Sequence, residues 1–96
     1  MIAIKPGVRV EGLQPEILLA LFIAHELYRE QAQALTLTCG TDGPHKVGSR
    51  HHCGQAVDLR LPTALKEKVV EQLKNRLGAE YDVVLEENHI HVEYDP

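Results

Sequence analysis

Apolar residues recur at helical spacing in two stretches of the chain. The first stripe has members three or four residues apart: Ile17, Leu21, Ala24, Tyr28 and Ala32. Charged side chains such as Glu26 and Arg29 fall mostly off this stripe, and Pro15 suits the first turn of a helix. The pattern therefore predicts an amphipathic helix over residues 15–34.

The second stripe advances in steps of four residues, through Leu65, Val69, Leu73 and Leu77. Pro62 and Thr63 mark the start of this helix, with Thr63 as the expected N-cap. Gly78 follows the last apolar residue and is expected to end the helix as its C′ residue. We therefore expect a second helix between these two signals.

Four segments alternate or are rich in β-branched residues, which predicts strands: 35–39, 55–61, 81–86 and 89–94. Glu87 and Asn88 form a tight turn between the last two strands. Residues 40–54 are rich in Gly, Ser, His and Pro, and a loop of this length in a small domain is usually functional or disordered. The order of elements predicts an α+β fold, a small mostly antiparallel sheet with two flanking helices.

Composition narrows the class of protein. The chain has 96 residues, of which 44% are hydrophobic, so residues 1–96 form one domain with a modest, aliphatic core. The net charge is −4 and the basic residues form no stripe, which argues against nucleic acid as a partner. The longest apolar run, Ile17–Ala24, is too short to cross a membrane. We expect a monomer with no membrane partner.

The N-terminal residues lack the apolar core and cleavage site of a signal peptide. We therefore expect synthesis in the cytoplasm, without a transmembrane segment. Cell lysis and packaging into a particle are non-standard routes by which such a protein could still leave the cell.

Five of the six histidines lie between positions 45 and 91, in two dense groups. In the second group, strand alternation places His89, His91 and Glu93 on one face. The two imidazoles are then about 6–7 Å apart along the strand, close enough to serve one metal-bound substrate. The alternative is a solvated strand face whose histidines have no chemical role.

The first group contains His51 and, in the strand that follows, Asp58. Val57 and Leu59 are expected to face the core, so Asp58 lies on the other face, and aspartate is unfavourable in mid-strand unless something uses it. It could instead be solvated at an edge or paired with an arginine. His51, Asp58 and one histidine of the His-x-His pair make three N and O ligands, the number that a catalytic zinc site uses.

The two cysteines, Cys39 and Cys53, are fourteen positions apart and belong to no Cys-x-x-Cys pair. In a protein made in the cytoplasm we expect two small, largely apolar side chains. A disulfide between them or ligation of a structural zinc ion are the alternatives.

Residues 49–58, SRHHCGQAVD, fit the pattern Ser-x-His-x-x-Gly-x-Ala-x-Asp, and His89-Ile90-His91 supplies His-x-His. Together they resemble the D-alanyl-D-alanine carboxypeptidase family of zinc metallopeptidases, which also contains phage endolysins. The wider group includes lysostaphin-type enzymes and the hedgehog signalling domain. The resemblance covers residues 36–94, and the overall look is most similar to small phage-encoded members.

The resemblance implies a hedgehog-like peptidase fold that holds one Zn²⁺ through His51, Asp58 and His91. It implies that His89 is catalytic, by hydrogen-bonding the substrate or stabilising the oxyanion, and that Ser49 binds the substrate. The substrate class is the peptidoglycan stem peptide, cut by a carboxypeptidase or an endopeptidase. Small residues at two positions of the motif, Gly54 and Ala56, are expected because the chain packs tightly beneath the site.

The sequence departs from the family pattern at the catalytic base. Many members carry a carboxylate three residues before the last histidine ligand, where this chain has Asn88. We expect Glu86, three residues before His89, to be the base, and Glu87 to lie on the surface of the turn. This departure keeps open a non-catalytic, zinc-containing binding module of the same fold.

A second departure lies upstream of the motif, where some members have an arginine that binds the substrate. Here the stretch is TDGPHK, and His45 or Lys46 could replace that arginine. The two remaining histidines are expected on the surface, His52 in the loop and His25 on the first helix.

Overall fold

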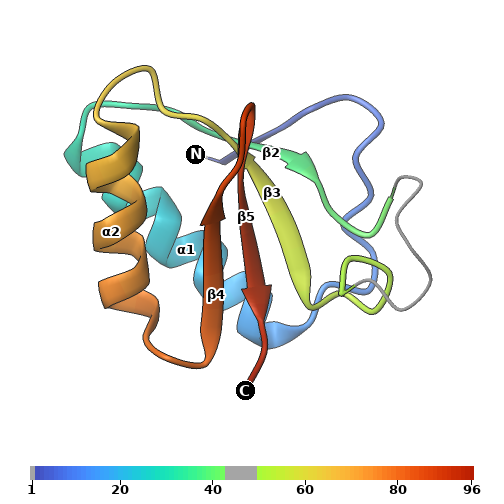
Figure 1. Cartoon of the computed structure of the whole chain (residues 1–96). Coiled ribbons are helices and arrows are strands. Elements are labelled where there is room, and N and C mark those ends of the chain that lie inside the picture. Colours follow the sequence, from blue (N-terminus) through green and yellow to red (C-terminus); the bar gives the residue numbers. More distant parts are fainter. Residues whose placement is uncertain (1, 43–49) are drawn as a thin grey trace.

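A five-stranded mixed sheet with two helices packed against one face forms the framework of this computed structural model, which describes residues 2–42 and 50–96 (Figure 1). The elements in chain order are β1 (Ile2–Ile4), α1 (Pro15–Glu30), β2 (Leu35–Cys39), β3 (Ala56–Arg60), α2 (Lys66–Leu77), β4 (Tyr81–Leu85) and β5 (His89–Tyr94). The sheet order is β1-β2-β3-β5-β4, with β1 parallel to β2 and each other neighbouring pair antiparallel. The predicted α+β fold with a mostly antiparallel sheet and two helices is confirmed.

The first strand, β1, is absent from the sequence prediction. It has only three residues, of which two are exposed, so it carries no usable alternation. Its pairing with β2 defines it, with Ile2 opposite Leu35 and Ile4 opposite Leu37. This parallel pair makes the sheet mixed, a feature that depends on a partner more than thirty residues away.

Both helices are shorter than predicted. The α1 helix begins at Pro15 as expected but ends at Glu30, because Ala32 adopts a left-handed conformation with φ 56°. The α2 helix begins at Lys66, and the residue before it, Leu65, is also left-handed and 57% exposed. Thr63 is not the N-cap, since its backbone N–H and its hydroxyl both donate to Gln33 Oε1, at 2.7 and 3.0 Å.

The core lies between the helices and one face of the sheet. Its largest fully buried side chains come from both helices and from β2, β3 and β5: Tyr28, Ile17, Leu27, Leu35, Leu37, Leu59, Leu73, Ile90, Val57, Val69 and Val92. Tyr28 also donates its hydroxyl to the Arg60 carbonyl at 2.9 Å, which ties α1 to the end of β3. None of the described helices is long and apolar enough to cross a membrane. The opposite face of the sheet carries polar strand residues, among them Asp58 and His91.

Candidate metal centre

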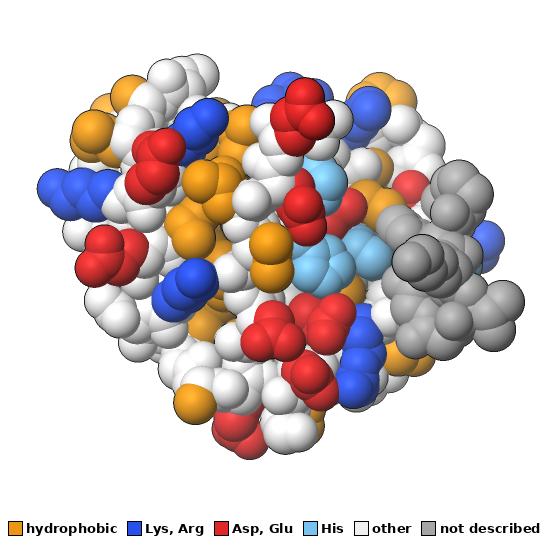
Figure 2. Space-filling model, in the orientation of Figure 1, with side chains coloured by type: hydrophobic (Ala, Val, Ile, Leu, Met, Phe, Trp, Pro, Cys, Tyr) orange, Lys and Arg blue, Asp and Glu red, His pale blue; other side chains and the backbone are white. Residues whose placement is uncertain are grey.

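The polar face of the sheet brings the two predicted histidine groups together. Asp58 in β3 lies directly opposite His91 in β5, and His89 lies two residues along the same strand. Val57 and Leu59 are buried in the core, which confirms that Asp58 is on the other face. Figure 2 shows the histidine side chains gathered on this face beside several acidic side chains.

One carboxylate oxygen, Asp58 Oδ1, is the point on which the three histidines converge. It lies 3.0 Å from His91 Nδ1, 3.3 Å from His51 Nε2 and 3.7 Å from His89 Nε2. The His51 residue is only 3% exposed, and its ring is 5.1 Å from the His91 ring, centroid to centroid. The fold therefore brings together all three residues that the resemblance names as metal ligands.

Hydrogen bonds on the far side of each ring define which nitrogen is available to a metal. The Gly40 carbonyl lies 2.9 Å from His51 Nδ1 and can only accept, so Nδ1 carries a proton. Nε2 then faces Asp58, with a lone pair in the neutral ring and as an N–H donor in the doubly protonated ring. A Glu93 carboxylate oxygen lies 3.1 Å from His91 Nε2, which leaves the Nδ1 lone pair facing Asp58 in the neutral ring. Carbonyl or carboxylate partners of this kind orient most histidines that bind metals in proteins.

The spacing of these atoms matches a tetrahedral ligand set. Two N or O donors at 2.0–2.1 Å from one tetrahedral metal are about 3.3–3.4 Å apart. The separations from Asp58 Oδ1 to His51 Nε2 and to His91 Nδ1 are 3.3 and 3.0 Å. Asp58 Oδ1 can therefore share one small divalent metal with either histidine nitrogen at an ordinary ligand spacing.

The electrostatics of the metal-free cluster centre on a charged aspartate. Burial alone would raise the pKa of Asp58, but the hydrogen bonds from His51 and His91 outweigh it and hold the pKa well below its usual range. The hydrogen bond to Asp58 raises the pKa of His91, burial opposes this, and Glu93 raises it further. A proton on His91 is thus stabilised at the place where a cation would bind, so proton and metal compete for the site.

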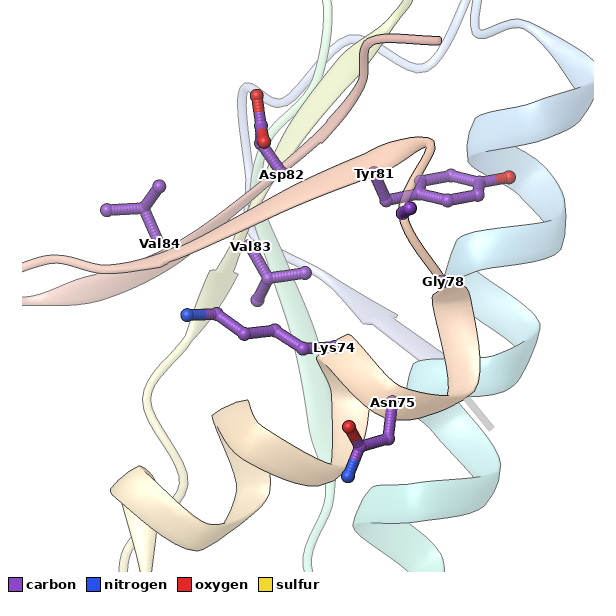
Figure 3. Close-up of a pocket in the computed structure, with 8 residues that line it drawn as sticks. Lys74, Asn75, Gly78, Tyr81, Asp82, Val83 and Val84 are labelled. Atoms are coloured by element: carbon purple, nitrogen blue, oxygen red, sulfur yellow. The ribbon is translucent and has the colours of Figure 1, made fainter.

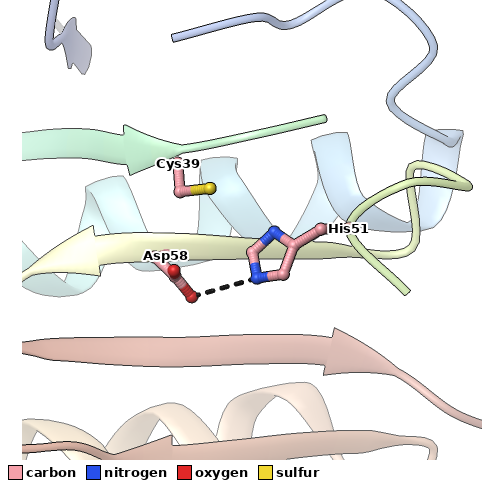
Figure 4. Close-up of side chains that lie close together, drawn as sticks. All are labelled: Cys39, His51 and Asp58. Atoms are coloured by element: carbon pink, nitrogen blue, oxygen red, sulfur yellow. Dashed lines mark ion pairs between the residues drawn. The ribbon is translucent and has the colours of Figure 1, made fainter. Parts of the chain in front are cut away.

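A fourth residue, Cys39, joins the cluster, although the sequence offered metal ligation by the two cysteines only as an alternative. The Cys39 sulfur, a ring nitrogen of His51 and a carboxylate oxygen of Asp58 all lie within 4.8 Å of one another (Figure 4). This group of sulfur, nitrogen and oxygen donors could hold a metal ion. The interpretation of Cys39 as a small apolar residue remote from the chemistry is therefore incomplete.

The second cysteine, Cys53, lies on the exposed loop after His51 and outside this group. Its thiol is placed to donate to the Arg50 carbonyl at 3.3 Å and to Gln55 Oε1 at 3.2 Å. No disulfide joins it to Cys39. The two cysteines therefore occupy different environments, and Cys39 alone is at the candidate centre.

The turn that contains His51 packs closely against the backbone near Gly12. Gly54 donates its N–H to the His51 carbonyl at 3.1 Å, and its own carbonyl accepts from Gln14 at 3.0 Å. A Cβ at Gly54 would lie 1.9 Å from the Gly12 carbonyl oxygen, and Gly54 has φ 78°. Ala56 is fully buried. The expectation of small residues packed tightly beneath the site is confirmed.

The predicted base, Glu86, follows β4 immediately and is exposed. Its N–H donates to the His89 carbonyl at 2.9 Å, so the two residues lie opposite each other where the hairpin closes. Asn88, in the turn, has its Oδ1 2.6 Å from His89 Nδ1. Ser49, together with His45 and Lys46, lies outside the described residues, so its predicted role stays a prediction.

Arg50 and the two histidines outside the cluster, His52 and His25, have their own surroundings. Arg50 bonds Asp95 at 2.8 Å and Gln55 at 2.9 Å, so it is engaged away from Asp58. His52 is exposed, as expected for a loop residue, whereas His25 is half-buried on α1. Asp58 is paired with His51 and His91, so the alternative in which it pairs with an arginine does not hold for Arg50.

A pocket of about 510 Å³ lies between the end of α2 and β4 (Figure 3). Its lining includes Lys74, Tyr81 and Val83 but none of the histidines that the structure describes.

Comparisons with protein families, with curated proteins and with solved structures give no match to this chain. Its function is therefore inferred from its own residues and their geometry.

Proposed function

We propose that this protein is a zinc-dependent hydrolase that cleaves an amide bond in peptidoglycan stem peptides, as a carboxypeptidase or an endopeptidase. One observation carries the hydrolase part of the proposal: His51 Nε2 and His91 Nδ1 face the same Asp58 oxygen at 3.3 and 3.0 Å. The substrate class follows from the resemblance of residues 49–58 and 89–91 to D-alanyl-D-alanine carboxypeptidases.

The proposed metal ligands are His51, Asp58 and His91. Two imidazole nitrogens and one carboxylate oxygen suit Zn²⁺, and three protein ligands are typical of its catalytic sites. Zinc held by this set supplies a Lewis acid that polarises a carbonyl group and acidifies water. The second ring nitrogens keep their bonds to Gly40 and Glu93, which hold both rings in the productive orientation.

We assign His89 to the substrate carbonyl. Its Nδ1 donates to Asn88 Oδ1, so Nε2 is a hydrogen-bond donor only in the doubly protonated ring. In that form Nε2–H can donate to the oxygen on which negative charge develops. Since Nε2 is 3.7 Å from Asp58 Oδ1, this donor lies beside the ligand set.

We assign proton transfer to Glu86. It lies directly across the hairpin from His89, and strand alternation places it on the same face as Asp82 and Val84 in β4. The side chain is exposed, so its carboxylate is accessible to water and to a substrate. It would accept a proton from the attacking water and pass it to the leaving amine. Ser49 would contribute a hydroxyl to substrate binding.

One observation favours a second candidate, a zinc-containing binding module without hydrolytic activity. Asn88 occupies the position at which many similar proteins carry the base, and its oxygen is engaged with His89 at 2.6 Å. An amide cannot accept the proton that a carboxylate takes. In this alternative the same ligands hold zinc, and the polar face binds a partner.

The two candidates differ in a single assay. Purified protein is incubated with peptidoglycan, with and without a chelator, and new amino groups are measured. We expect chelator-sensitive release by the wild type and by Glu87→Gln, an exposed turn variant, but not by Asp58→Asn. Tightly bound zinc without release would support the binding module. Full activity of Glu86→Gln would show that another group is the base.

A further inference from the structure

The Cys39 side chain reaches the polar face because of a β-bulge. Leu37 pairs with Leu59, but Cys39 pairs with Asp58, so β2 has one extra residue between these two pairs. With regular alternation, Cys39 would point into the core with Leu35 and Leu37. Bulges redirect side chains in this way and are common beside active sites. The extra residue therefore places a thiol next to the carboxylate at the centre of the histidine cluster.

We propose that Cys39 is a fourth protein ligand of the metal, so that the resting site is closed and opens for hydrolysis only when the sulfur leaves. The inference rests on the proposed function for the other three ligands, His51, Asp58 and His91. It adds a form of regulation, in which the Cys39 thiolate competes with water for the remaining position.

The distances permit this ligation after a small movement. A sulfur at 2.3 Å and a nitrogen at 2.0 Å from one tetrahedral zinc are about 3.5 Å apart. The Cys39 sulfur already lies within 4.8 Å of the donor atoms of His51 and Asp58. Each of these two separations therefore exceeds the tetrahedral value by at most about 1.3 Å, a difference smaller than the movement of Sγ between two χ1 rotamers. In Figure 4 the sulfur lies on the His51 side of the group.

Binding of a metal by Cys39 replaces the S–H bond of the thiol with a sulfur–metal bond. The thiol is placed to donate to the Asp42 carbonyl at 3.4 Å, a weak hydrogen bond. On ligation the S–H bond breaks, the proton goes to solvent, and the thiolate donates an electron pair to the metal.

Four protein ligands change what the site can do. Zinc sites with four protein ligands are closed and structural, whereas catalytic sites keep one position for water or substrate. With Cys39 bound, the protein would hold zinc firmly and hydrolyse slowly. Removal of the sulfur leaves His51, Asp58 and His91, so it should weaken zinc binding but increase turnover.

The decisive experiment replaces zinc with Co²⁺ in the purified full chain. Thiolate bound to Co²⁺ produces an intense charge-transfer band in the near ultraviolet, which nitrogen and oxygen ligands do not. We expect the band in the wild type and in Cys53→Ser, the matched control, and its loss in Cys39→Ser and Cys39→Ala. Chelator competition should show zinc affinity at least about tenfold lower in the Cys39 variants, and peptidoglycan hydrolysis should be faster.

The spectra of the wild type and Cys53→Ser decide the question even if the Cys39 variants fold poorly. Bound Co²⁺ without the band would overturn ligation by Cys39 and leave the three-ligand site intact. A charge-transfer band in the wild type, together with unchanged hydrolysis by Cys39→Ala, would refute the closed resting state. Absence of any bound metal in the wild type would instead remove the proposed function on which the inference rests.

Discussion

The central prediction concerns Asp58→Asn, which removes one negative charge and leaves the shape of the side chain almost unchanged. The Asp58 side chain is 13% exposed, and its Oδ1 is the oxygen that faces His51 Nε2 and His91 Nδ1. Asparagine keeps one oxygen acceptor but cannot neutralise a cation. We therefore expect the variant to fold and to lose its stabilisation by zinc.

The stabilisation that Asp58→Asn should lose can be calculated from the coupling between zinc binding and folding. A ligand that binds only the folded state at 100 times its dissociation constant stabilises that state by about 2.7 kcal/mol. For 96 residues, an unfolding entropy of about 2.1 cal/mol/K per residue converts this to a Tm increase of roughly 13 °C. In the absence of metal, loss of the charge-assisted hydrogen bonds from the histidines should cost about 1.5–3 kcal/mol.

The assay is thermal unfolding of each protein in chelator and at several zinc concentrations. Glu87→Gln is the control, because it also removes one carboxylate charge, from an exposed residue of the turn between β4 and β5. The wild type and this control should show the full, concentration-dependent increase in Tm, and Asp58→Asn should show almost none. An equal increase in all three proteins would refute Asp58 as a metal ligand.

Three other measurements test the surroundings of the site. In the metal-free protein, the lowered pKa of Asp58 stabilises the fold above pH of about 3.9, and this contribution is lost as the pH falls. The raised pKa of His91 stabilises the fold below pH of about 6.5, and this contribution is lost as the pH rises. The pair should therefore contribute most between these values, and an identical pH profile of unfolding free energy in Asp58→Asn would contradict this. Glu93→Ala should weaken zinc binding about 10–100-fold in chelator competition, with a smaller loss for Glu93→Gln, because a Glu93 oxygen lies 3.1 Å from His91 Nε2 and orients that ring. Unchanged zinc affinity would exclude this role of Glu93. Gly54→Ala should lower the free energy of unfolding in urea by more than Gly78→Ala does. Both glycines have positive φ, but only Gly54 is in close backbone contact, with the Gly12 carbonyl. Equal losses of stability would show that the backbone at Gly12 moves aside at no cost.

Local pattern was enough to predict most of the elements. The strands Leu35–Cys39 and His89–Tyr94 have the predicted bounds, because alternation and β-branched residues act within a few positions. The ends of the helices were less predictable. Leu65 fits the apolar stripe of α2, yet it is exposed and left-handed, because Thr63 bonds Gln33 from another part of the chain.

The sequence by itself predicted that His89 and His91 share one face of their strand and that Asp58 points away from the core, because side chains alternate along a strand. It could not place His51, which lies in a loop, or the pairing of the two strands. Tertiary structure decided how these side chains meet. The Gly40 carbonyl selects the His51 tautomer, and a bulge in β2 turns Cys39 toward the metal ligands that we propose. Both effects depend on strands and loops distant in sequence, whose register no local pattern specifies. The three ligands proposed from the sequence are thus in contact, and the thiol beside them becomes visible only in the folded protein.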